Sequence, residues 1–101
     1  MTTNPREFIV KRKVLDHLSG IPGVFAYSTP VSRYGRSGIA DITAVINGKA
    51  VYIECKRPST YNNQTAAQKA FEGAVKAAGG YYFVVDSVDR LVSHLVDSEL
   101  V

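Results

Sequence analysis

The chain has one cysteine, two histidines and no long run of apolar residues. A single cysteine, Cys55, excludes an internal disulfide and a cysteine-based zinc cluster. His17 and His94 have no metal-ligand companion at helical or strand spacing, and we interpret both as ordinary surface or boundary residues. No apolar run approaches membrane-spanning length, and the polar first ten residues do not resemble a secretory signal. We therefore expect a soluble intracellular protein without a membrane partner.

Repeats, linkers and low-complexity segments are also lacking. A chain of 101 residues then predicts one small domain over residues 1–101. Hydrophobic residues make up 46% of the chain, which is enough to form a core, and the formal net charge is +3. A mildly basic chain permits a polyanionic partner but does not demand one.

Residues 38–56 predict a β-hairpin. Asn47-Gly48 lies between two runs rich in β-branched residues, which is the strongest short-range signal for a two-residue hairpin loop. This loop pairs Ile42 with Ile53. Because side chains alternate along a strand, one face of the hairpin is predicted to be a core face. It carries Ile42, Ala44, Ile46, Val51, Ile53 and Cys55.

The same register places two carboxylates opposite each other, Asp41 and Glu54, with Lys56 on the same face. Like charges directly across an antiparallel pair are destabilising. Two such carboxylates either share a proton or hold a cation, and Mg²⁺ prefers carboxylate oxygens. The alternative is that Lys56 neutralises both acids in a salt-bridged surface patch. The hairpin alone leaves both interpretations open.

The flanking segments predict an α/β fold with the order α-β-β-β-α-β-α, a mixed sheet flanked by helices on both faces. The predicted elements are a helix over 5–18, a strand over 24–29, the hairpin, a helix between Thr65 and Gly79, a strand over 81–85 and a helix after Ser87. In the second helix, the side chains expected to face inward are those of Ala67, Ala70, Phe71, Ala74, Val75 and Ala78. Glu7 and Gln68 each suit the third position of a capping box.

Basic residues gather in two segments before the hairpin. The loop over 31–38 contains Arg33 and Arg36 and leads directly to Asp41, and arginine suits bidentate phosphate recognition. The alternative is a solvated loop. The run over 11–13, Lys11-Arg12-Lys13, has the same two interpretations.

Asp41, followed after twelve residues by Glu54-Cys55-Lys56, resembles the PD-(D/E)xK nuclease signature. A wider ordered set is similar to the virus-type replication–repair nuclease (VRR-NUC) domain, from Glu7 to about Val85. That set comprises Gly38-Ile-Ala-Asp41, the Gly48 turn, Ile53 to Lys56, Gln68 and Gly79-Gly80 before an apolar strand. Ala40, where the signature has proline, is a departure that removes no ligand. The resemblance implies a restriction-endonuclease-like core.

The resemblance also implies roles for individual residues. Asp41, Glu54 and the backbone carbonyl of Cys55 would bind Mg²⁺ or Mn²⁺, and Lys56 would orient the attacking water and stabilise developing negative charge. Gln68 and Glu7 would lie at the site and take part in catalysis, although each also has a capping explanation. The candidate DNA contacts are Lys11, Arg33, Arg36 and Arg57.

The function that the resemblance implies is a metal-dependent, structure-selective DNA endonuclease of repair or recombination. Stand-alone domains of this kind resemble homodimeric four-way (Holliday) junction resolvases, which leads us to expect a homodimer in the cytoplasm of a bacterial cell or phage-infected host. The first helix and the strand over 24–29 are the candidate dimer surfaces. The alternatives are a nickase or flap endonuclease of the same chemistry, a non-catalytic DNA-binding module on the same fold, and a purely structural domain.

Overall fold

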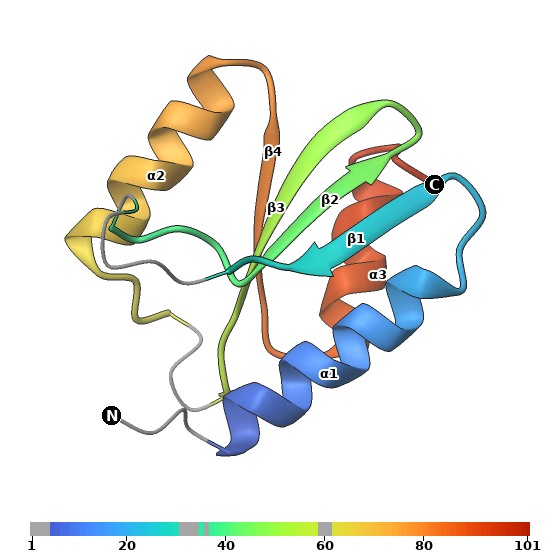
Figure 1. Cartoon of the computed structure of the whole chain (residues 1–101), viewed down its shortest axis with the longest axis horizontal. Helices are drawn as coiled ribbons and strands as arrows, with labels where there is room; N and C mark the ends of the chain where they lie inside the picture. Colours follow the sequence, from blue (N-terminus) through green and yellow to red (C-terminus); the bar gives the residue numbers. More distant parts are fainter. Residues whose placement is uncertain (1–4, 31–34, 36, 59–61) are drawn as a thin grey trace.

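The predicted order of elements is confirmed in a computed structural model of the chain, which describes residues 5–30, 35, 37–58 and 62–101 (Figure 1). The elements are α1 (Pro5–Ser19), β1 (Val24–Ser28), β2 (Ile42–Ile46), β3 (Lys49–Cys55), α2 (Ala66–Ala77), β4 (Tyr81–Val85) and α3 (Val88–Asp97). The ends of α1 and β1 each differ from the prediction by one residue.

The four strands form one mixed sheet in the order β1-β2-β3-β4. β1 pairs with β2 and β2 with β3 in antiparallel fashion, whereas β3 and β4 are parallel. The parallel pair requires a crossover connection, and α2 provides it. Both outer strands, β1 and β4, have no neighbouring strand beyond them among the described residues.

The predicted hairpin register is confirmed. Ile42 pairs with Ile53 and Ile46 with Lys49. Asn47 and Gly48 both have positive φ, at 48° and 83°, as a type I′ turn requires. All six side chains of the predicted core face are buried.

Helices α1 and α3 cover one face of the sheet, and α2 lies on the other (Figure 1). The core forms between the sheet and the first pair of helices. It combines the core face of the hairpin with Val14, Leu18, Phe83, Val85, Leu91, Leu95 and Leu100. None of the described helices is long and apolar enough to cross a membrane.

The predicted inward face of α2 is directed toward the sheet, since Ala74, Val75 and Ala78 line the space between α2 and β3, but it is not buried. No residue of this helix is buried, and Ala70, Ala74 and Ala78 are exposed. The contact of this helix with the sheet is made by a larger, aromatic side chain. Phe71 bridges the gap, with its ring centroid 5.4 Å from that of Tyr52 and 6.1 Å from that of Tyr82.

Candidate functional site

Four of the predicted site residues meet on the α2 side of the sheet. Asp41 immediately precedes β2, Glu54 is the penultimate residue of β3, and Lys56 follows that strand. Gln68 comes from the first turn of α2. The site therefore lies where the start of β2, the end of β3 and the beginning of α2 converge.

Asp41 is held beside Glu54 by the backbone of the neighbouring strand. The Oδ2 atom of Asp41 accepts a hydrogen bond of 2.8 Å from the backbone N–H of Cys55. The backbone carbonyl of Asp41 accepts another from the N–H of Thr29, also at 2.8 Å. Asp41 lies one position beyond the Ile42–Ile53 pair, as the register predicts. The charge of Asp41, and a hydrogen bond that the protonated Glu54 carboxyl donates to the Asp41 carboxylate, contribute to raising the pKa of Glu54.

Glu54 is a buried carboxylate with one partnered and one unpartnered oxygen. The residue is only 4% exposed, and its Oε2 atom accepts a hydrogen bond of 2.9 Å from Nε2 of Gln68. Its Oε1 atom is buried and accepts no hydrogen bond from any described donor. Burial first, and then the charge of Asp41, raise the pKa of Glu54 from 4.5 to about 8. When Glu54 is ionised, the positive charge around it is therefore too small to stabilise the carboxylate.

Lys56 provides too little positive charge to balance the burial of Glu54 and the charge of Asp41. Its Nζ atom lies 3.9 Å from Oε2 of Glu54, at the long end of the ion-pair range, and the residue is 9% exposed. The charge of Lys56 lowers the pKa of Glu54 but does not outweigh burial and Asp41. With both side chains buried, a salt-bridged surface patch does not describe this cluster.

Gln68 both caps α2 and contacts the charged residues of the cluster. Its backbone N–H donates to Oγ1 of Thr65, and its Oε1 atom accepts from the N–H of Thr65 at 2.9 Å, which completes the capping box. The same Oε1 atom accepts a hydrogen bond of 3.2 Å from Nζ of Lys56. Since Nε2 binds Glu54, the amide of Gln68 links the helix cap to Glu54 and Lys56.

Two further predicted residues, Glu7 and Lys11 of α1, affect pKa values in the cluster through their charges. Glu7 is half-buried, and its charge contributes to raising the pKa of Glu54. Burial first, then the charges of Asp41 and Glu54, raise the pKa of the Cys55 thiol, and the charge of Lys11 opposes this increase.

Of the remaining predicted basic residues, the structure describes only Arg57. Arg57 follows Lys56 and is half-buried, with interactions of its own. Arg33 and Arg36 lie outside the described residues, so their predicted contact with phosphate stays a prediction.

Tyr82 is a site neighbour that the sequence analysis missed. It is buried and pairs in register with Tyr52. Burial first, and then the charge of Glu54, raise the pKa of its phenol. The period-two alternation of β4 could have placed it on the α2 side, but the continuous apolar run concealed that alternation.

The donor set fits a magnesium ion whose protein ligands are few. No group of three or more His, Cys, Asp or Glu side chains that could hold a metal ion occurs in the part of the chain that the structure describes. Mg²⁺ commonly keeps several waters and uses one or two carboxylates together with phosphate oxygens of the substrate. The unpartnered Oε1 of Glu54, beside a second carboxylate, is the specific feature that a cation would satisfy.

Comparison with known proteins does not assign the chain to a family. No family model matches its sequence, and no curated protein matches it. The relation to VRR-NUC domains therefore stays a prediction based on the motif.

Proposed function

We propose that the chain is a metal-dependent endonuclease that hydrolyses phosphodiester bonds in branched DNA, acting as a homodimer on four-way junctions. The observation that carries the proposal is the unpartnered, buried Oε1 of Glu54 beside Asp41 and Lys56. A structural ion pair would satisfy this oxygen internally. A site that binds a cation and a phosphate would instead keep this oxygen without a protein partner.

The chain's own residues would divide the chemistry between them. Asp41, Glu54 and the carbonyl of Cys55 would hold Mg²⁺ or Mn²⁺, which when bound supplies an acidified water and offsets phosphate charge. Lys56 would donate a hydrogen bond to the attacking water or to a phosphate oxygen. Gln68 positions Lys56, because its Oε1 fixes the ammonium group 3.2 Å away. Glu54 would lose its proton as the cation enters.

The proposed substrate follows from size and charge. A small chain with a net charge of +3 would contact DNA through phosphates, which positions it by shape rather than by base sequence. Lys11, Arg57 and the predicted contacts Arg33 and Arg36 would provide the cations. A four-way junction needs two symmetric cuts, and a two-fold dimer matches that symmetry. The setting would be DNA repair or recombination in a bacterial cell or phage-infected host.

The direct test incubates the purified protein with labelled four-way junction, flap, splayed-arm and linear duplex DNA, with Mg²⁺ or with EDTA. We expect cleavage of the junction only with the metal, by paired symmetric cuts. Asp41→Asn protein, purified in parallel, controls for contaminating nucleases. Preference for the flap would support the nickase or flap-endonuclease alternative, and junction binding without any cleavage would support the non-catalytic module.

The double role of Gln68 gives a prediction with an internal control. Gln68→Ala removes the half of the capping box in which its side chain accepts from the N–H of Thr65, together with the link to Lys56 and Glu54, whereas Thr65→Ala removes only the other half, the Oγ1 acceptor. We expect each variant to lose about 1 kcal/mol of stability, measured by thermal unfolding. Only Gln68→Ala should also lower the cleavage rate at saturating Mg²⁺, by tenfold or more. Equal activity of the two variants would show that Gln68 is a cap and nothing else.

A further inference from the structure

Half of the sheet face that carries the candidate site has no described helix over it. α2 packs against β4 and the neighbouring part of β3, and none of the described helices covers β1 and β2 on that side. Phe25, Tyr27 and Val45 are 66%, 44% and 46% exposed. Phe25 pairs in register with Val45, and Tyr27 with Thr43, so these side chains share one face. We call Phe25, Tyr27 and Val45 the bare half-sheet.

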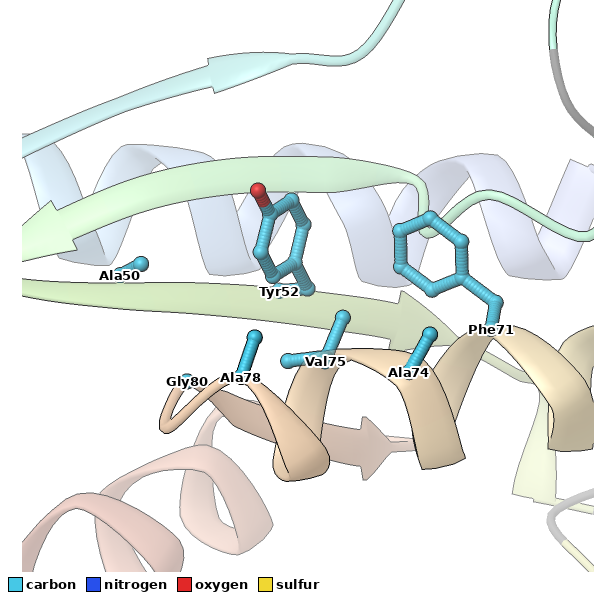
Figure 2. A pocket seen from close by; sticks show the side chains of 7 residues that line it. All are labelled: Ala50, Tyr52, Phe71, Ala74, Val75, Ala78 and Gly80. Carbon is cyan, nitrogen blue, oxygen red and sulfur yellow. The ribbon is translucent and has the colours of Figure 1, made fainter.

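A hollow of about 290 Å³ lies between β3 and α2, next to the bare half-sheet. Figure 2 shows Ala74, Val75 and Ala78 of the helix directed toward Ala50 and Tyr52 of β3. The hollow exists because alanines line both of its sides. It joins the bare half-sheet directly, since Ala50 pairs in register with Val45.

The chemistry of this surface favours a protein partner over DNA. No residue of the bare half-sheet or of the hollow's lining carries a charge, whereas DNA binding depends on cations that neutralise phosphates. One predicted cation, Lys11, belongs to α1, on the opposite face of the sheet (Figure 1). The chain has a net charge of +3, so two copies meet with less repulsion at an uncharged surface than at a basic one.

The surface also carries both an exposed aromatic side chain and a hollow. Phe25 projects from β1, and a recess of matching character lies about 10 Å away across β2, because neighbouring strands are about 4.8 Å apart. A prominent side chain and a recess on one face allow an isologous two-fold contact. β1 is in addition an edge strand, and exposed edges are usually covered.

We propose that the bare half-sheet binds a second copy of the chain, with Phe25 of each protomer packed over Val45 of the other at the mouth of its hollow. The two half-sheets would pack face to face around a two-fold axis that runs along the strands between β1 and β2, at the spacing of about 10 Å that is usual for stacked sheets. Each edge strand β1 would lie beside the partner's α2, where Ala74 and Ala78 leave room for it. This inference specifies the interface of the homodimer in the proposed function.

Asp41 is four residues from Val45 along β2, about 14 Å at the usual rise per residue. Both candidate sites would therefore lie at one end of the dimer, beyond the packed half-sheets. That arrangement suits two symmetric cuts in one branched substrate.

The experiment measures mass by sedimentation equilibrium, which does not depend on nuclease activity. We expect the wild-type chain to be a dimer, and Phe25→Glu and Val45→Lys each to be monomeric because the change places a charge in the interface. Val96→Glu is the matched control, since Val96 is 56% exposed on α3, across the sheet. It should remain a dimer. Thermal unfolding of all variants verifies that they are folded.

Mixing the Phe25→Glu and Val45→Lys proteins tests the predicted geometry. The mixed dimer contains one Glu–Lys contact and one native Phe–Val contact, so we expect the mixture to regain dimers that neither variant forms alone. A monomeric wild type, or a dimer that survives both substitutions, would overturn the proposal. A Phe25→Glu protein that has the same mass as the wild type in solution but binds single-stranded DNA more weakly would also overturn the proposal. A dimer that lacks nuclease activity would support this interface and contradict the proposed function. A monomer with nuclease activity would contradict this interface and support the proposed nuclease chemistry.

Discussion

Glu54→Gln is expected to stabilise the metal-free protein by a few kcal/mol above pH 8 and to abolish metal-dependent cleavage. Glu54 is buried, and the pKa of its carboxyl is raised to about 8 by burial and by the charge of Asp41. Ionised Glu54 therefore destabilises the fold. Glutamine has nearly the same shape and can keep the hydrogen bond to Gln68, but it carries no charge and is a poor ligand for Mg²⁺.

The sign of the pH dependence follows from proton binding. Below about pH 4.5 the Glu54 carboxyl is protonated in both the folded and the unfolded chain, and it contributes no difference. Between about pH 4.5 and 8 the folded chain keeps a proton that the unfolded chain has lost, so the free energy of unfolding falls as pH rises. Urea unfolding in EDTA at pH 5, 7 and 9 should show a stability difference between Glu54→Gln and wild type that increases over this window and is constant above it.

Glu72→Gln is the matched control for this substitution. Although partial burial opposes it, hydrogen bonds with Lys76 and Gln64 lower the pKa of Glu72. Its carboxylate is thus stabilised by the fold, and glutamine at this position should not stabilise the protein at high pH. Mg²⁺ should raise the unfolding temperature of wild type and of Glu72→Gln, but not that of Glu54→Gln. A stability difference for Glu54→Gln that does not vary with pH would contradict the account of the site.

The sequence was sufficient for the fold where local chemistry leaves few alternatives. Asn47-Gly48 fits a turn with two positive φ angles, and this turn sets the register that brings Asp41 next to Glu54. Thr65 and Gln68 define the start of α2 through a capping box that the structure contains. In each case residues close in sequence determine the geometry, so pattern and structure agree.

The features that could not be predicted depend on distances between layers. Alanines at helical spacing indicate which side of α2 is apolar, but not whether the helix lies close enough to the sheet to bury them, and Ala74 and Ala78 stay exposed. The burial of Glu54 and its unpartnered oxygen depend on the same distance, because α2 covers that end of β3. The exposure of Phe25 follows from what α2 leaves uncovered, and strand alternation alone does not show it.

Gly38→Ala is expected to destabilise the protein by about 3 kcal/mol, which lowers the unfolding temperature by at least about 10 °C for a domain of this size. Gly38 has a φ of +76°, a conformation that side chains disfavour. A Cβ atom on it would also lie 2.4 Å from the carbonyl carbon of Ala67 and 2.7 Å from the backbone nitrogen of Gln68. These are backbone atoms of the first turn of α2, and they cannot yield without moving the helix.

Gly79→Ala separates the clash from the unfavourable φ angle. Gly79 lies at the other end of α2 with a φ of +88°, and nothing lies within 4 Å of its added Cβ. It should cost only the 1–2 kcal/mol typical of a left-handed conformation, so the excess loss in Gly38→Ala measures how tightly the segment before Asp41 packs on α2. Because the clash displaces Gln68, Gly38→Ala should also reduce cleavage at a temperature where both variants are folded, whereas Gly79→Ala should not. Equal losses of stability in the two variants would mean that this segment is free to move away from the helix, and that Gln68 is positioned by its cap alone.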